Sequence, residues 1–326
     1  MSRKWLGAAA GVLLGVLPVF PKSYLFFLEV QAVAGYSSQE KGPVFFSMSQ
    51  MEAMQKPSFG FDYVKKLTGK TRDYATLAVQ VRLAYNHEGE DRLEFQLYNG
   101  YLKYKAGFAD LWIGHSRPAL GLSSVLDSHA LLLPTLAMMG FGFDRDWGIG
   151  AARDFPWGNA SFSLTTGTGM PLRLEGNYLA SARVSRGVLS RDNYSLGVSL
   201  AFGDVLETMG NHLISGEPMG FRCIAADVSY FRDNIENRLE VLAGEKNARS
   251  TYALFWRLGI NLMAEGRLKL EAQPVLRKDD GKWKSLISAG ASYQLSADLT
   301  ARSTVLYDRA TRDTRIIFQL YYYKLM

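Results

Sequence analysis

The stretch "YATLAVQVRLAYN", residues 74–86, decides the fold of this chain. Apolar side chains such as Leu83 alternate along it with polar or small side chains such as Arg82, so the two sets lie on opposite faces of a strand. An ordinary strand has about 5–6 residues. This alternation continues for about a dozen, which is long enough for a tilted strand to cross a bilayer. The stretch therefore predicts a strand with one face toward lipid and the other toward water.

The same alternation recurs along the chain. The clearest further examples are residues 92–104, 177–185, 194–202, 251–263, 266–276, 284–296, 298–308 and 314–325. Turn clusters such as "NHEGED" (86–91) and "RKDDGK" (277–282) separate the runs and leave no room for crossover helices. A meander of about 14–16 such strands curls and closes on itself. We expect an all-β fold, a closed antiparallel β-barrel.

Two kinds of closed barrel have to be distinguished. A soluble barrel would bury its apolar face, whereas a transmembrane barrel turns that face to lipid and keeps a polar interior. Tyrosines stand near the ends of apolar runs, as in interfacial girdles: Tyr85, Tyr178, Tyr194, Tyr252, Tyr293, Tyr307 and Tyr322. The opposite faces carry arginines and amides that a packed core would leave without partners. These features favour a transmembrane barrel in the bacterial outer membrane, with outer-membrane lipid as its surroundings.

The N-terminus has the pattern of an export signal. A basic start precedes the apolar stretch 5–20, and Ala32 and Ala34 form a small-x-small cleavage site. We expect a signal peptide over residues 1–34, a lead-in or first strand over 35–57, and the transmembrane barrel over 58–326.

The predicted lumen carries more basic than acidic side chains. The chain has 37 Lys and Arg against 31 Asp and Glu, a net charge of +6. The basic residues predicted to line the lumen and set its selectivity are Arg82, Arg183, Arg257, Lys269, Lys284, Arg302 and Arg315. Such an excess attracts small anionic solutes into a narrow wet pore. The alternative is that these charges pair with Glu94, Glu240 and Glu271 across neighbouring strands and only keep the lumen wet.

Residues 116–140 depart from the strand pattern, because they are apolar and are interrupted by Pro118 and Pro134. We expect this segment to fold into the lumen as a constriction, since irregular backbone at membrane depth is tolerated only against protein or water. Its candidate pore-lining residues are Arg117, Asp127 and His129. The alternatives are an external loop or a contact between subunits.

Residues 110–155 resemble a segment of the phosphate-selective porins, a family of Gram-negative outer-membrane proteins. The matching positions are Gly114, Pro118, Gly121 and Leu122, followed by Arg145, Asp146, Gly148 and Ile149. The resemblance covers one segment, and the rest of the chain agrees in pattern alone. It implies an anion-selective outer-membrane channel, usually a homotrimer, with phosphate among its solutes. The loop region lacks the lysine cluster with which that family holds phosphate.

No motif predicts enzymatic chemistry, a cofactor or a metal site. His212 and Ser215 are three apart, which on a strand places them on opposite faces, so they do not form a nucleophile and base pair. The single cysteine, Cys223, permits no internal disulfide and is expected to be a reduced core thiol. Basic runs with interleaved aromatics, which would indicate nucleic-acid binding, are not found.

The sequence therefore predicts a porin, a water-filled and weakly anion-preferring diffusion channel for small solutes. Two other functions remain open. One is a scaffold barrel that sheathes a partner protein, such as a redox conduit, and the other is a lipid-hydrolysing outer-membrane enzyme.

Overall fold

The computed structural model describes residues 24–51, 55–70, 72–87 and 92–326. The strands are β1 Tyr24–Ser37, β2 Gly42–Val44, β3 Ser58–Thr68, β4 Asp73–Tyr85, β5 Leu93–Lys105, β6 Asp110–Ser116, β7 Asp146–Phe155, β8 Gly158–Thr165, β9 Tyr178–Arg186, β10 Tyr194–Met209, β11 His212–Arg232, β12 Ile235–Lys246, β13 Arg249–Leu262, β14 Leu268–Asp279, β15 Lys282–Gln294, β16 Leu299–Asp308 and β17 Asp313–Leu325. The short helices are η1 Leu122–Ser124, η2 Ala137–Met139, α2 Leu189–Asp192 and η3 Ala264–Gly266.

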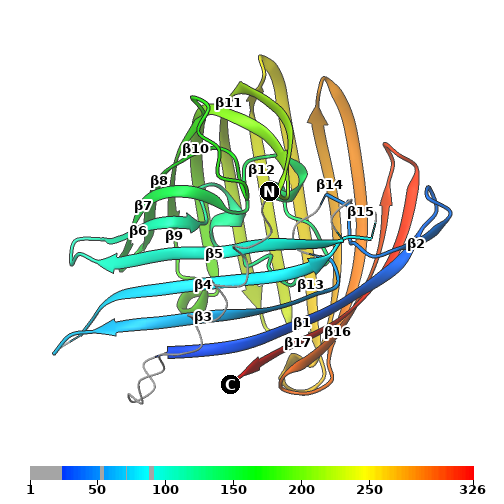
Figure 1. Ribbon diagram of the computed structural model, residues 1–326, viewed down its shortest axis with the longest axis horizontal. Helices are drawn as coiled ribbons and strands as arrows, with labels where there is room; N and C mark the ends of the chain where they lie inside the picture. The colour runs from blue at the N-terminus through cyan, green and yellow to red at the C-terminus, as the bar shows by residue number, and fades with distance from the viewer. Residues whose placement is uncertain (1–23, 52–54, 71, 88–91) are drawn as a thin grey trace, which may run out of the picture.

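These strands form one closed antiparallel barrel. Each strand from β3 to β17 pairs with its neighbour in sequence, and β1 pairs with both β3 and β17. Figure 1 shows this closure, with the blue strand β1 beside the red strand β17. The three-residue β2 adds to the end of β1, and the other sixteen strands of the described chain make up the barrel. The predicted closed antiparallel barrel of about 14–16 strands is confirmed.

The barrel wall is apolar outside and carries polar side chains inside, the reverse of a soluble protein. In β4, Leu83 is 45% exposed, whereas Arg82 on the opposite face is 1% exposed. Phe95, Trp256 and Phe318 likewise project from the outer surface. This outer belt matches the lipid-facing band of a transmembrane barrel. Over the described residues, no helix combines the length and apolar character that a membrane crossing requires.

The two ends of the barrel differ in the length of their connections. One end, the short-turn end, carries brief turns such as 69–72, 106–109 and 233–234. The other end, the long-loop end, carries the connections 38–57, 117–145 and 166–177. Outer-membrane barrels place short turns in the periplasm and long loops outside the cell. This asymmetry orients the barrel in the membrane.

The first barrel strand begins earlier than the sequence predicts. The expected domain boundaries put a cleavage after Ala34 and the barrel at residue 58, but Tyr24–Ser37 form β1, which closes the barrel. Its Glu29 and Gln31 face the lumen and are buried. Removal of residues up to Ala34 would leave β3 and β17 without most of the strand between them. The apolar stretch 5–20 lies outside the described residues.

Candidate functional site: the lumen and its inserted loop

Residues 117–145, between β6 and β7, fold into the lumen; we call them the inserted loop. Their backbone bonds to side chains of distant strands. The Gly121 N–H donates to Ser199 Oγ of β10 (2.9 Å), and the Leu122 N–H donates to Glu240 Oε1 of β12 (3.1 Å). From β13, Arg257 donates to the Leu133 carbonyl (3.0 Å). Three separate strands thus hold the loop, and the predicted insertion of residues 116–140 is confirmed.

An apolar contact holds the same loop against one side of the wall. The loop contributes Leu120, Leu122, Leu136, Met139 and Phe141 to the largest buried cluster. The wall contributes Leu179, Ala201, Val205, Phe221, Cys223, Ala225, Leu242, Ala253, Phe255, Val275, Leu286 and Leu306. The expectation of a uniformly polar interior is therefore wrong over β9–β16, where apolar side chains also point inward. They do so because the loop removes this part of the wall from water. The expected reduced core thiol, Cys223, is free and buried in this contact.

A polar cluster fixes the loop to the opposite side of the wall. His129 Nε2 lies 3.0 Å from both carboxylate oxygens of Glu29 in β1. Arg82 of β4 forms an ion pair with Glu29 and donates to the His129 carbonyl (3.2 Å). The side chains of Arg82 and Glu29 are both fully buried. His129 is thus an anchor of the inserted loop.

The other two residues predicted to line the pore from this loop, Arg117 and Asp127, contact each other. Arg117 and Asp127 form an ion pair at 2.7 Å. Arg145 lies 3.6 Å from the same carboxylate and stacks over the Tyr98 ring at 4.2 Å. Burial by itself would raise the pKa of Asp127, but the charges of Arg117 and Arg145 outweigh it and lower that pKa. Asp127 is therefore charged at neutral pH and neutralises part of the basic lining.

The inserted loop divides the lumen into two cavities. The short-turn cavity has a volume of about 1240 Å³ and is bordered by the loop residues Arg117 and Asp127. The long-loop cavity has a volume of about 630 Å³ and is bordered by residues 137–145. The residues described around one cavity do not recur around the other. The inserted loop thus lies between the two cavities.

The two cavities carry opposite charge. Nine basic and four acidic residues line the short-turn cavity. Six acidic and four basic residues line the long-loop cavity. At the mouth of the short-turn cavity, Arg72 and Lys105 are exposed.

The seven basic residues predicted to line the lumen are spread over three environments. Arg183, Arg257 and Lys269 line the short-turn cavity, and Arg315 lines the long-loop cavity. Arg82, Lys284 and Arg302 belong to neither lining.

Most of these seven side chains have acidic partners. The pairs are Arg82–Glu29, Arg183–Asp227, Lys269–Glu236, Lys269–Glu271, Lys284–Asp279 and Arg315–Asp313. Arg257 and Arg302 donate instead to Gln273 (2.7 Å) and Gln319 (2.9 Å). Pairing across strands, the alternative left open by the sequence, thus applies to most of them, although only Glu271 among the three predicted acids takes part.

Sequence reasoning missed basic residues near the mouth of the short-turn cavity, among them Arg72, Lys105 and Arg238. They lie in a turn or near strand ends, where the alternating pattern carries least information. Within the described chain, no group of three or more His, Cys, Asp or Glu side chains is placed to hold a metal ion.

Comparisons with known proteins agree on the architecture. No family model matches the chain, and no curated protein matches it. Among solved structures, the anion-selective porin of Comamonas acidovorans has a TM-score of 0.64 at 12% identity, over 93% of this chain and 99% of that one. OmpT of Vibrio cholerae, an outer-membrane protein in a trimer form, has a TM-score of 0.65 at 10% identity, over 92% and 99%.

OmpF of Salmonella typhi has a TM-score of 0.67 at 9% identity, over 92% of this chain and 97% of that one. The predicted location, the bacterial outer membrane, agrees with this likeness and with the apolar outer belt. The chain has the fold of the bacterial outer-membrane porins.

Proposed function

We propose that the chain is an outer-membrane porin that passes small solutes with a weak preference for anions. The observation that carries the proposal is the charge of the short-turn cavity, where nine basic residues face four acidic ones. Six of the nine are arginines, whose planar guanidinium matches carboxylate and phosphate oxyanions. Oxyanions such as phosphate are therefore the solutes that this lining suits best.

The anion preference depends on side chains at the mouth rather than on the buried pairs. Arg183 is paired with Asp227 at 2.6 Å, and both side chains are almost fully buried. Arg72 and Lys105, in contrast, are exposed at the cavity mouth. Over the described residues neither forms an ion pair with a carboxylate, so their charges act on entering ions.

The decisive experiment compares reversal potentials of single barrels in a planar bilayer under a potassium chloride gradient. Arg72→Glu with Lys105→Glu should shift the reversal potential toward cation selectivity. The matched control is Arg222→Glu on the outer face, where the side chain is 72% exposed and pairs with Glu245. An unchanged potential in the double variant, or an equal shift in the control, would contradict the assignment of selectivity to the mouth.

The inserted loop bears on the scaffold alternative. A barrel that sheathes a partner protein needs an open lumen, but here the loop contacts opposite sides of the wall through Glu29 and Glu240. This occupation of the lumen favours a channel for small solutes over a sheath.

We also propose that the protein is not an enzyme. His212 and Ser215 lie in β11, where a bulge between them breaks the alternation and pairs them with Met209 and Glu207, which share one face of β10. Over the described residues, no hydrogen bond joins the two side chains. Ser215 Oγ accepts the Glu217 N–H (3.3 Å). Neither observation supports a nucleophile activated by a base. Incubation with phospholipid vesicles tests this directly, with no release of fatty acid as the expected result.

Two properties of the mature protein complete the proposal. We place the end of the export signal before Tyr24, because β1 must remain for the barrel to close. N-terminal sequencing of the protein from membranes checks this.

We further propose a homotrimer, by analogy with the trimer form of the similar OmpT structure. Native mass spectrometry from detergent distinguishes a trimer from a monomer.

A further inference from the structure

The long-loop cavity is lined by an unusual number of methionines. The chain has 11 methionines. Seven of them border this cavity: Met48, Met51, Met138, Met139, Met170, Met209 and Met219. They come from the connection after β1, from the inserted loop, from the connection after β8, and from β10 and β11. Segments far apart in sequence thus place the same side-chain type around one space.

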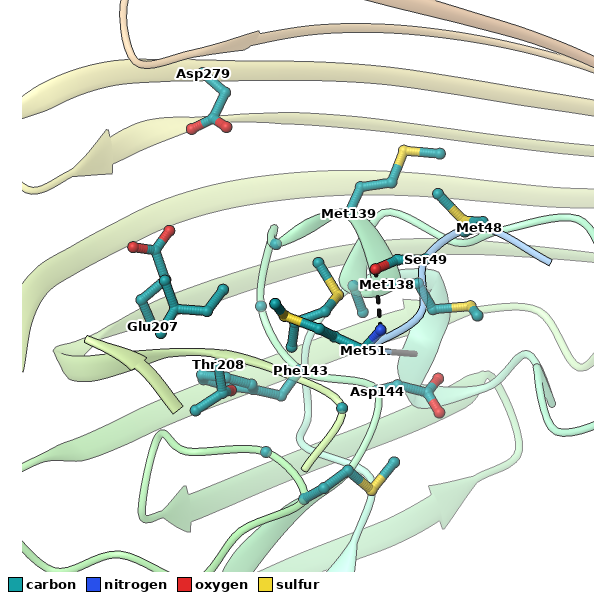
Figure 2. Close-up of a pocket in the computed structure, with 18 of the residues that line it drawn as sticks. Met48, Ser49, Met51, Met138, Met139, Phe143, Asp144, Glu207, Thr208 and Asp279 are labelled. Carbon is teal, nitrogen blue, oxygen red and sulfur yellow. Dashed lines mark hydrogen bonds between the residues drawn. The ribbon is translucent and has the colours of Figure 1, made fainter. Parts of the chain in front are cut away.

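Some of these methionines are at the cavity surface, whereas Met139 is part of the buried apolar contact. Met51 is 45% exposed, and Met138 and Met209 are half-buried. Figure 2 shows Met48, Met51, Met138 and Met139 grouped around the cavity. Methionine is unbranched, flexible and polarisable, so a surface made of it adapts to apolar guests of different shape and contacts aromatic rings favourably.

Carboxylates face this apolar surface from the opposite side. In Figure 2 the carboxylate of Asp279 points into the space beside Glu207 and Met139. Each of these two carboxylates also pairs with a lysine, since Lys246 lies 3.4 Å from Glu207, and Lys284, which is outside the lining, lies 3.4 Å from Asp279. The lining as a whole has two more acidic than basic residues, six against four. The cavity thus combines an adaptable apolar wall with a surplus of negative charge.

We propose that the long-loop cavity binds amphipathic organic cations, molecules with an aromatic or apolar body and one positive charge. Its volume of about 630 Å³ lies within the range of small-molecule sites. The methionines would contact the apolar body, and the acidic surplus of the whole lining, six acidic residues against four basic ones, would attract the charge. The proposal does not depend on the anion preference of the channel, because it concerns binding in the other cavity.

The test uses two probes of the same shape and opposite charge, tetraphenylphosphonium and tetraphenylborate, titrated into the detergent-purified barrel by calorimetry. The same detergent without protein gives the background for each ion. The wild-type barrel should bind the phosphonium at least about fivefold more tightly than the borate. Equal affinities, or tighter binding of the borate, would overturn the proposal.

Two variants separate the apolar from the electrostatic part. Met138→Gln with Met209→Gln should weaken phosphonium binding about fivefold, whereas Met263→Gln, in an exposed turn at the other end, should leave it unchanged. Glu207→Gln with Asp279→Asn should weaken the phosphonium about fivefold without weakening the borate. An equal loss in Met263→Gln would show that binding occurs outside the cavity and would also overturn the proposal. Resistance of the folded barrel to unfolding in sodium dodecyl sulfate confirms that each variant is intact.

Discussion

Arg82 of β4 and Glu29 of β1 form an ion pair across the intervening strand β3, with both side chains fully buried. The same guanidinium holds the His129 carbonyl of the inserted loop. The pair therefore connects strands near the closure of the barrel and also anchors the inserted loop.

The first prediction concerns the stability that this pair provides. Arg82→Ala leaves a carboxylate buried without its counter-charge, which should cost about 3–5 kcal/mol in the free energy of unfolding. The matched control is Arg222→Ala, which removes an exposed pair with Glu245 at 2.7 Å and should cost about 0–1 kcal/mol. Urea titration of the barrel in lipid vesicles measures both. Equal losses of unfolding free energy in the two variants would show that burial does not determine how much the Arg82–Glu29 pair stabilises the barrel.

The second prediction uses Cys223, the only cysteine of the chain, to report on the inserted loop. Its thiol is buried beneath Leu122 and its neighbours. A small maleimide added to the folded barrel should therefore react slowly. Rapid labelling of the wild-type protein would mean that the loop does not cover β11.

The same thiol should become reactive when the loop is displaced. Gly121 has a φ of 54°, and a Cβ there would collide with the Glu240 carboxylate. Gly121→Ala should therefore lift this part of the loop from the wall and raise the labelling rate at Cys223. Gly107→Ala is the matched control, because Gly107 also has positive φ but no atom lies within 4 Å of the added Cβ. A rate that rises equally in both variants would point to a general loss of stability.

The third prediction concerns acid conditions. Burial lowers the pKa of His129, and the charge of Arg82 lowers it further, so the imidazole is neutral at pH 7. In the unfolded chain this group takes up a proton at about pH 6.5, and in the folded chain only at lower pH. The stability that neutral His129 contributes is thus present above about pH 6.5 and is lost as the pH falls through the pKa of His129 in the folded chain.

Acidification below about pH 6.5 should accordingly loosen the loop and raise the single-barrel conductance. His129→Gln keeps a side chain that can donate to Glu29 but cannot titrate, so its conductance should vary less. If the variant follows the wild type across the range, His129 is not the group that responds to acid.

The barrel itself could be predicted from sequence because its signal is local. Leu83 faces outward and Arg82 faces the lumen because successive side chains of a strand point to opposite faces. This two-residue alternation is visible in residues 74–86 alone. The apolar run at 116–140, broken by proline, likewise indicated a segment in the lumen without any knowledge of its contacts.

What could not be predicted depends on contacts between distant residues. Ala32 and Ala34 have the spacing of a cleavage site, but in the structure they are alternate outward positions of β1. The apolar inner wall includes Phe221 and Phe255, which belong to different strands and form one surface only when the barrel closes. Pairing of the predicted selectivity residues, such as Arg183 with Asp227, depends in the same way on strand register.

The reversal potential of the wild-type barrel in a tenfold potassium chloride gradient, recorded together with its conductance, tests the central claim most directly. A barrel that holds a wet lumen with a basic short-turn cavity should conduct ions and give a reversal potential displaced toward that of chloride. A barrel that conducts no ions, or a potential displaced toward that of potassium, would contradict the account.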